Sequence, residues 1–541
     1  MKNISSTGSF INFYLNNYIY IDKTKYISDI VKLERVFISR PRRFGKSLTL
    51  DTIATLFETG VEPYFKGTRI YDKWTEPTYP VLRLNFLNFD KNSLEKFNNK
   101  LNSKITEFAE LNDVTTYKEK KEAEDSIDHL LEQLRLEGRQ IVILIDEYDC
   151  QMTANINNET LYKQFQEKIK SFYANIKDKF AIKFLGITGV TRLKDVSIFS
   201  VGSDIRDITN ASAYSQMIGF TRDEIKKFYI DYLKLAASYE NNCSVDDVTD
   251  TQIESLLDRL AQNYDGYCFD EFYKKKVFST WSVNSFFQSI VENKFVFFDE
   301  YWYDNGGLPS ILVNYLKTHE LNIFEYLDKD KFLKVSSDDF KNPTALTTIN
   351  QNVLMCQTGY LTLRSDLKKS STVLLGIPNG EIYKALNRLL ANNIFKGKAD
   401  VTDDQGKNLL EEGTVDDIIN LFNSALNSVS YDNYPIVSES SVQNMLKLYL
   451  LGAHQEVLSE VHEAKGRADL IVNTDIRRIV FEFKYAQNES EAKTKLSEAV
   501  EQIKSRDYGN ILPKKHELLR IAAVFNADPK VRAFTENQIV P

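Results

Sequence analysis

The segment from Ser39 to Leu50, SRPRRFGKSLTL, most constrains what this chain can fold into. A short apolar run at 36–38 precedes it, Pro41 and Gly45 interrupt that run, and apolar residues then recur with helical spacing at positions 50, 53, 54 and 57. A strand, loop and helix of this kind directs backbone N–H groups toward an anion, and the helix dipole adds to the attraction. The segment therefore predicts a phosphate-binding loop.

Three residues at the end of this loop fit the needs of a polyphosphate. Gly45 permits a tight turn, Lys46 can reach the β- and γ-phosphate oxygens, and Ser47 offers a hydroxyl for Mg²⁺. The generic GxxxxGK(S/T) pattern has glycine where this chain has Arg40, so a basic surface turn that ends in Gly-Lys-Ser is the alternative. We expect ATP and Mg²⁺ here, with nucleotide contacts from Arg43, Phe44, Gly45, Lys46, Ser47 and Leu48, and from Thr188 on a later strand.

Length and composition set the class of protein. A chain of 541 residues is too long for one hydrophobic core, and usual domain sizes predict about three or four units. Its four cysteines lie far apart without CxxC spacing, which argues against a disulfide framework or a zinc site. No run of about 18 apolar residues occurs and the start lacks a signal-peptide pattern, so we expect a cytoplasmic protein without a membrane segment. The net charge of −8 limits any nucleic-acid surface to a local groove.

A second motif, QIVILIDEYDC, runs from Gln140 to Cys150, and in it five consecutive apolar residues precede two carboxylates. Such a run predicts a central parallel strand, and carboxylates at its C-terminal end lie where α/β sheets bind ligands. We expect Asp146 to hold Mg²⁺ and Glu147 to polarise the attacking water, with Asp149 as the next candidate base. The alternative is a buried strand that stops at a polar turn.

The spacing of the two motifs is typical of one class of ATPase. A strand candidate at 79–86 lies between them in the sequence, and a glutamate follows the aspartate. This layout is that of the additional-strand P-loop ATPases, the AAA and RecA kind. A further strand at 181–192 ends in Thr188 and Thr191, and either hydroxyl could sense the γ-phosphate.

The residues from 431 to 541 differ in pattern from those before them. A helical stretch from Ser438 to Leu451 precedes the strand candidates EVLSEV, ADLIVN and RRIVFEFKYA, and a helix from Ser490 to Arg506 precedes the strand LLRIAAVF. This order predicts a small α/β domain. Residues 221–430 have a mainly helical pattern, and we expect a lid or linker there.

Polar residues in the C-terminal domain occur where chemistry on a phosphodiester would need them. Asp469 opens the second strand, and Glu482 and Lys484 alternate along the third, so that both project from one face. If these strands pair, the two carboxylates converge on Mg²⁺ or Mn²⁺, and Lys484 can steady the nucleophile or the phosphate. Glu460 could complete the metal shell, and Gln502 could orient Lys484 or the substrate. The alternative is an amphipathic strand with charges on its wet face.

With these residues in place, the chain resembles AAA-ATPase-like proteins fused to a C-terminal PD-(D/E)XK nuclease-superfamily domain. The resemblance spans nearly the whole chain and includes the blocks RPRRFGKSL, IVILIDEYD, ITGVTRLKDVSIFS, QTGYLTL, GRADLIV, IVFEFKYA and EQIKSRDY. Members of that family usually have RPRRFGKS, so Arg40 departs from the generic loop and agrees with the family. The resemblance implies a nucleotide and Mg²⁺ site at Lys46, Ser47, Asp146 and Glu147, and a nuclease-like site at Glu460, Asp469, Glu482, Lys484 and Gln502.

We therefore predict an α/β multidomain protein with an AAA-like P-loop ATPase domain at 1–220, a helical region at 221–430 and a restriction-endonuclease-like domain at 431–541. The first hypothesis for its function is an ATP-controlled, Mg²⁺-dependent nuclease that acts on nucleic acid, with DNA favoured. The second is a nucleotide-dependent switch whose nuclease-like domain binds a partner without cutting, and a homo-oligomer or a partner protein stays open. Residues 431–541 hold 15 basic and 16 acidic residues, so any groove for DNA depends on arrangement alone.

Overall fold

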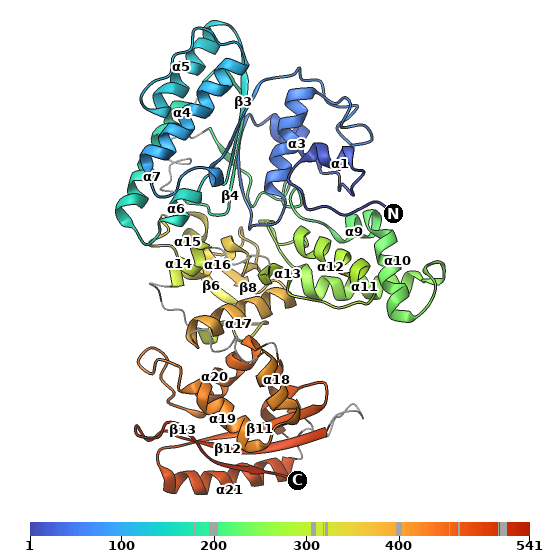
Figure 1. Ribbon diagram of the computed structural model, residues 1–541, viewed down its shortest axis with the longest axis vertical. Coiled ribbons are helices and arrows are strands. Elements are labelled where there is room, and N and C mark those ends of the chain that lie inside the picture. Colours follow the sequence, from blue (N-terminus) through green and yellow to red (C-terminus); the bar gives the residue numbers. More distant parts are fainter. Residues whose placement is uncertain are drawn as a thin grey trace. The chain divides into compact units, whose positions relative to one another are not determined.

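The computed structural model divides the chain into two compact units. Unit 1 comprises residues 1–321 and 330–382, and unit 2 comprises residues 322–329 and 383–541 (Figure 1). The domain boundaries predicted near 220 and 430 stay predictions. The described residues are 1–176, 179–193, 204–304, 310–316, 319, 323–343, 345–395, 403–453, 455–463, 466–506, 508 and 517–541.

A parallel five-stranded sheet forms the centre of the first part of unit 1. Its strand order is β2-β3-β4-β1-β5, and every neighbouring pair is parallel. All six residues of β3 are buried, as expected for a strand covered on both faces. The strands are β1 (Arg35–Ser39), β2 (Val81–Asn85), β3 (Ile141–Asp146), β4 (Ile182–Gly189) and β5 (Arg206–Asp207).

The sheet order places the two nucleotide motifs two strands apart. The strand that lies between them in the sheet is β4, which comes after both in the sequence, whereas β2 lies at an edge of the sheet. The predicted α/β fold with a parallel sheet is confirmed. The additional strand between β1 and β3 is β4.

Helices cover both sides of this sheet. In Figure 1, α4, α5 and α7 lie on one side of it, and α1 and α3 lie on the other. Helix α3 forms because its apolar positions repeat with helical spacing and are buried, and it ends at Gly60. The helices are α1 (Phe10–Leu15), α2 (Thr24–Val31), α3 (Lys46–Thr59), α4 (Leu94–Leu111), α5 (Ala123–Leu136), α6 (Cys150–Ala154) and α7 (Glu159–Ile176), with the 3-10 turn η1 (Phe86–Asn88).

The remainder of unit 1 is mainly helical and carries a second, antiparallel sheet of order β6-β8-β7. A cluster of buried apolar residues from α9 to α12 forms the core of the helical part. The elements are α9 (Arg222–Phe228), α10 (Ile230–Asn241), η3 (Val245–Asp247), α11 (Asp250–Tyr264), α12 (Thr280–Asn293), α13 (Tyr301–Asp304), α14 (Ser310–Leu316), β6 (Leu333–Ser336), α15 (Ser337–Lys341), α16 (Gln351–Thr358), β7 (Thr362–Leu363) and β8 (Thr372–Gly376). Helix α17 (Gly380–Ile394) begins in unit 1 and continues in unit 2.

Unit 2 contains a five-stranded sheet of order β13-β12-β11-β10-β9, in which only the β11–β12 pair of the described strands is parallel. Helix α21 packs on one face of this sheet, and α19 and α20 lie on the other side in Figure 1. The elements are η4 (Ile323–Glu325), α18 (Asp403–Glu412), α19 (Val415–Leu426), α20 (Glu439–Gly452), β9 (Glu456–Glu463), β10 (Gly466–Asn473), β11 (Arg477–Ala486), α21 (Glu489–Arg506), β12 (Glu517–Asn526) and β13 (Ala533–Ile539).

None of the helices in the described part of the chain combines the length and apolar character that a bilayer crossing requires.

Candidate functional site

The loop between β1 and α3 has the geometry of an anion-binding turn. Gly45 has a φ of +103° and directly precedes the helix, a conformation that glycine adopts without the strain a side chain would bring. Lys46 is buried, and its Nζ lies 3.1 Å from the carbonyl oxygen of Arg40 and 3.3 Å from that of Pro41. Oε1 of Glu147 is 3.4 Å from the same amine. The ammonium therefore lies over the loop, where a phosphate at the helix N-terminus would meet it.

A hydrogen-bonded group joins this loop to the end of β3. The Ser47 hydroxyl donates to Oδ2 of Asp146 at 2.6 Å, and the Thr188 hydroxyl of β4 donates to Oδ1 at 2.5 Å. The backbone N–H of Glu147 also donates to Oδ1 at 3.0 Å. A hydroxyl and a carboxylate in contact are the hard oxygen ligands that Mg²⁺ prefers, so these side chains fit such an ion. Thr188 holds Asp146 in position.

Glu147 and Asp149 have different environments. Glu147 borders the cavity above the loop and has a φ of +53°. Asp149 is buried, and its Oδ2 accepts hydrogen bonds from the N–H of Thr191 at 2.7 Å and from its hydroxyl at 2.6 Å. Burial raises the pKa of Asp149, with the charge of Glu147 adding to the effect. The geometry therefore makes Glu147 the better candidate base, and Asp149 and Thr191 brace the chain after β4.

The cavity above the loop has a volume of about 490 Å³, within the usual range of about 300–1,000 Å³ for small-ligand sites. Besides the loop, it is lined by the N-terminal segment at 5–8 and by Thr280 and Trp281 of α12. These residues could not be predicted from the motif, because they come from positions far from it in the sequence. They form the rest of the wall around the loop.

Two side chains of the loop are held in place by contacts with residues distant in the sequence. Phe44 is buried, and its ring makes an edge contact with Tyr267 at 4.8 Å between centroids. The guanidinium of Arg43 lies 4.5 Å from the ring centre of Trp281, and its backbone carbonyl accepts a hydrogen bond from Thr280. Arg43 and Phe44 are thus anchors of the loop, and any contact from Phe44 to a nucleotide would come from its backbone.

Arg40 replaces the first glycine of the generic pattern, and its side chain lies beneath the loop. Its Nη1 donates to the carbonyl oxygens of Ser39 at 2.9 Å and Thr209 at 2.7 Å. The guanidinium also lies 4.1 Å from the ring centre of Phe269, and burial lowers the pKa of Arg40 to about 9. The arginine therefore ties β1 to the segment after β5, a role that glycine could not fill.

In unit 2, strand register assembles the second candidate site. Leu470 of β10 pairs with Phe481 of β11, so the next positions, Asp469 and Glu482, face each other across the two strands. Leu470 also pairs with Ser459 of β9, which places the backbone of Glu460 at the neighbouring position of the third strand. The side chain of Glu460 lies outside the described residues.

The Glu482 carboxylate is fully buried, and Lys484 reaches it. Nζ of Lys484 lies 2.9 Å from Oε1 of Glu482 and 3.3 Å from Oε1 of Glu439, and it also donates to the Phe483 carbonyl at 3.1 Å. Oδ2 of Asp469 accepts from the N–H of Phe483 at 2.8 Å. The structure therefore brings the side chains of Asp469, Glu482 and Lys484 close together, and their role as a catalytic site stays a prediction.

The electrostatics of this group suit a cation. Burial, and then the charge of Asp469, raises the pKa of Glu482 to about 7, and within the described residues its Oε2 has no hydrogen-bond partner. Burial lowers the pKa of Lys484, but the charge and hydrogen bond of Glu482 more than offset this, so the net shift is upward. Among the described residues no three His, Cys, Asp or Glu side chains are close enough to hold a metal ion by themselves. The buried, unpartnered oxygen of Glu482 beside Asp469 is nevertheless what a hard divalent ion would satisfy.

Gln502 lies on helix α21, which packs on β11 and β12. Lys495 lies seven residues before Gln502 and Arg506 four residues after it, so the three share one helix face. The pKa of Lys495 is raised mainly by its hydrogen bond to Glu498, with a small opposing effect of the Lys484 charge. The pKa of Arg506 is raised mainly by its hydrogen bond to Tyr508, with smaller effects of Glu482 and Asp469. Half-buried Gln502 therefore lies on the helix face that carries Lys495 and Arg506, and its role at the carboxylates stays a prediction.

Two residues of this region were not singled out from the sequence. Glu439, in the first turn of α20, pairs with Lys484 from 45 positions away. Gln443, one turn further along α20, donates to the backbone carbonyl of Asp469. The Ser438 cap predicts the start of this helix, but the sequence alone does not indicate that the first turn of the helix contacts β11.

Comparisons with known proteins agree with this division. Residues 5–199 match the model of the family described as predicted AAA-ATPase, and residues 437–534 match the model of the PD-(D/E)XK nuclease superfamily. The chain thus combines an AAA-ATPase-like segment with a C-terminal segment of the PD-(D/E)XK nuclease superfamily, and the resemblance predicted from the sequence is confirmed.

A curated relative and a solved structure are among the proteins that are similar to the chain. An uncharacterized protein in the vnfD 5'region of Azotobacter chroococcum mcd 1 is 26% identical over 531 residues, which cover 95% of this chain and 94% of that protein. The crystal structure of Cdc6p from Pyrobaculum aerophilum matches with 12% identity and a TM-score of 0.21, over 66% of this chain and 87% of that one. A TM-score this low carries no argument about the fold.

Proposed function

We propose that this protein binds and hydrolyses ATP in unit 1 and uses unit 2 as a Mg²⁺-dependent nuclease, with DNA as the favoured substrate and ATP controlling the cleavage. In unit 1, Lys46 would exchange the carbonyls of Arg40 and Pro41 for phosphate oxygens. Ser47 and Asp146, already in contact, would hold Mg²⁺. Glu147 would orient the attacking water.

The observation that carries the nuclease assignment is the buried Glu482 carboxylate, with an oxygen that lacks a partner in the described residues, beside Asp469 and Lys484. Asp469 and Glu482 would hold the divalent ion, with Glu460 as the third ligand. When bound, such an ion activates water and stabilises charge on the phosphodiester. Lys484 would then turn from Glu482 toward the nucleophile or the phosphate, and Gln502 would orient Lys484 or the substrate.

Incubation of the protein with plasmid, linear and single-stranded DNA and with RNA, in Mg²⁺ with and without ATP, tests this proposal. We expect cleavage that requires Mg²⁺, and we expect Glu482→Gln, which keeps the shape of the side chain, to abolish it. Glu517→Gln, a change to an exposed carboxylate on β12, is the matched control and should cut normally. Lys46→Ala should remove only the dependence of cleavage on ATP, and the cleavage itself should persist.

A second function is favoured by the pairing of Lys484 with two carboxylates. Glu439 and Glu482 both contact its amine, which leaves that charge internally compensated, and residues 431–541 carry no net positive charge. A nucleotide-dependent switch whose nuclease-like domain binds a partner without cutting would fit this arrangement. Absence of cleavage under every condition above, with ATP hydrolysis intact, would support the switch and overturn the nuclease.

A further inference from the structure

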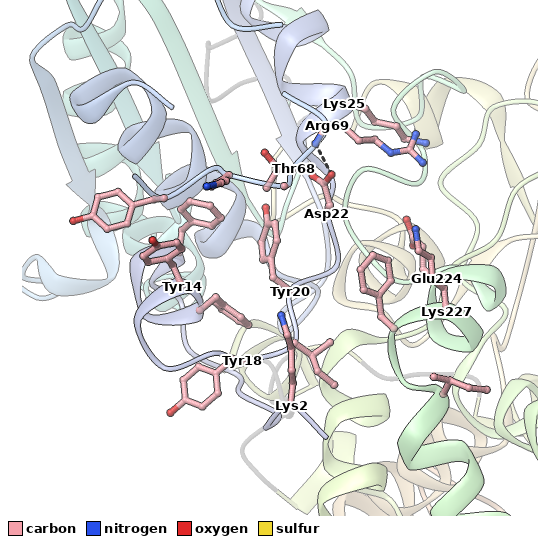
Figure 2. A pocket seen from close by; sticks show the side chains of 18 of the residues that line it. Lys2, Tyr14, Tyr18, Tyr20, Asp22, Lys25, Thr68, Arg69, Glu224 and Lys227 are labelled. Carbon is pink, nitrogen blue, oxygen red and sulfur yellow. Dashed lines mark hydrogen bonds between the residues drawn. The ribbon is translucent and has the colours of Figure 1, made fainter. Parts of the chain in front are cut away.

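A second large cavity lies in unit 1, beside the one above the phosphate-binding loop. Its volume is about 760 Å³, and its walls come from α1, the segment at 18–25, the loop at 64–69 and residues 223–232 of α9 and α10 (Figure 2). The two cavities share Phe13, Ile19 and Tyr20, but no residue of the phosphate-binding loop lines this one. It is therefore a separate site next to the proposed ATP site.

Tyrosine rings stand at one end of this cavity with their orientations fixed. Tyr14 is 48% exposed, and Tyr64 meets it edge-on, with ring planes at 88° and centroids 5.5 Å apart. Phe13 holds Tyr18 in a similar edge contact at 6.0 Å and 80°. An edge contact fixes a ring while leaving faces free for a further planar group. Figure 2 shows Tyr14 and Tyr18 on the same side of the cavity.

Positive side chains line the rest of the cavity, and within the described residues none of them forms an ion pair with a carboxylate. Lys25 and Lys227 lie over the rings of Tyr26 and Phe228 instead. Figure 2 shows Lys25 and Arg69 near each other and Lys227 across from the tyrosines. The five cations are Lys2, Lys25, Lys66, Arg69 and Lys227.

Two of the carboxylates in the lining are positioned by contacts within the protein. Asp22 accepts hydrogen bonds from the N–H and hydroxyl of Thr24 at 2.9 Å and 2.6 Å and from the N–H of Arg69 at 2.8 Å. Glu224 pairs with Lys23 at 2.6 Å and caps α9. Asp223 and Asp231 complete the acidic lining, so five cations face four carboxylates, of which Glu224 already pairs with Lys23.

We propose that this cavity binds a segment of single-stranded nucleic acid, with bases stacked on Tyr14 and Tyr18 and phosphates near Lys25, Arg69 and Lys227. Exposed aromatic faces together with unpaired cations are the combination that holds single strands without reading their sequence. An acidic peptide would use the cations but would not need the tyrosine faces. The inference adds a site in unit 1 to the proposed function, and it does not require that unit 2 cut.

The wall that carries the tyrosines is attached to the helix that follows the phosphate-binding loop. The N–H of Phe10, at the start of α1, donates to Oδ2 of Asp51 on α3 at 2.6 Å. Tyr20, which borders both cavities, shares a hydrogen bond with Thr52 of the same helix. The proposed strand site and the proposed ATP site therefore share one supporting helix.

Fluorescence anisotropy of a labelled oligothymidylate, with full-length protein in EDTA so that no cleavage occurs, tests the inference. We expect Tyr14→Ala to weaken binding about tenfold, since one stacked base contributes about that much, and Tyr14→Trp to restore it. Because Tyr14 is half exposed, its replacement should leave the thermal midpoint unchanged. Phe180→Ala, at an exposed ring of unit 1 away from the cavity lining, is the matched control and should bind normally.

The salt dependence of the same binding tests the cations. Arg69→Ala and Lys227→Ala should each reduce the slope of log affinity against log salt by about 0.7, whereas Lys100→Ala on exposed α4 should not change it. Absence of binding would overturn the inference. Full affinity in Tyr14→Ala would overturn it too, because the oligonucleotide would then bind elsewhere. The inference would also be overturned if polyglutamate displaced the labelled oligonucleotide at the same charge concentration as unlabelled oligonucleotide does. The cavity would then bind anions without stacking bases.

Discussion

The Ser47 hydroxyl lies 2.6 Å from Oδ2 of Asp146, although 99 residues separate the two in the sequence. The contact joins the phosphate-binding loop to the end of β3. Thr188 completes it by donating to the other oxygen of the same carboxylate. Three hydroxyl and carboxylate groups from α3, β3 and β4 therefore meet beside Lys46. The predictions for unit 1 depend on this arrangement.

Replacement of Lys46 by alanine should remove most of the affinity for ATP. Among the described residues of the loop, Lys46 and Arg40 are the buried basic side chains. Arg40 lies beneath the loop, so of these two only Lys46 can contact the phosphate. Loss of a charge-assisted contact to phosphate corresponds to a tenfold to hundredfold change, about 1.5–3 kcal/mol. Calorimetric titration of ATP measures it, with Lys100→Ala as the control. Unchanged affinity in Lys46→Ala would remove the loop from nucleotide binding.

Glu147→Gln should bind ATP with nearly unchanged affinity and hydrolyse it at least a hundredfold more slowly. The amide keeps the shape of the side chain, but it cannot orient or polarise water as the carboxylate does. Phosphate release under saturating ATP measures the rate, and a filter-binding assay measures affinity.

The control for this experiment is Asp149→Asn. Asp149 is buried and accepts two hydrogen bonds from Thr191, so its replacement should lower the free energy of unfolding, by about 1–3 kcal/mol, more than it lowers the rate per folded molecule. If Glu147→Gln hydrolyses ATP normally and folded Asp149→Asn does not, the two roles are reversed.

The stability of unit 1 should fall as the pH rises from about 4.5 to 8, because Glu381 is buried. Its Oε1 accepts from the N–H of Trp302 at 2.8 Å and its Oε2 from the Ser282 hydroxyl at 2.7 Å. Burial raises its pKa from 4.5 to about 8. The folded state therefore retains a proton that the unfolded chain has released, so the contribution of the group is complete below pH 4.5 and is lost as the pH passes 8.

Glu381→Gln should remove that pH-dependent loss, since the amide mimics the protonated acid and can still accept from Trp302 while donating to Ser282. At pH 9 the variant should be more stable than the wild type, by on the order of 3 kcal/mol. All three tryptophans lie in unit 1, so urea unfolding followed by their fluorescence reports on this unit. Glu110→Gln, at an exposed position of α4, is the control. Parallel pH profiles for wild type and Glu381→Gln would contradict the assignment.

Local patterns predicted the parts of both sites that depend on one segment. The strand, loop and helix around Lys46 are encoded by adjacent residues, and the run before Asp146 has the apolar character of a fully buried strand. Alternation along β11 was enough to place Glu482 and Lys484 on one face, because the side-chain period of a strand is two. These features follow from neighbours in the sequence.

Features that depend on distant segments could not be predicted. The position of β4 between β1 and β3 joins strands that are distant in the sequence. Glu439 meets Lys484 only because α20 packs against β11. The burial of Arg40 against Phe269 likewise joins residues from distant parts of unit 1.

Calorimetric titration of Mn²⁺ into the full-length protein tests the central claim, that Asp469 and Glu482 form a cation site able to support phosphodiester chemistry. Two carboxylates on facing positions repel each other, on the order of 1–4 kcal/mol near a surface, and a divalent ion would relieve that repulsion. Every protein sample carries Lys46→Ala, which prevents the unit 1 site from binding nucleotide and Mn²⁺ together. We predict a binding heat in this background that Asp469→Asn abolishes and that Glu517→Gln leaves intact. Identical heats with and without Asp469→Asn would contradict the claim.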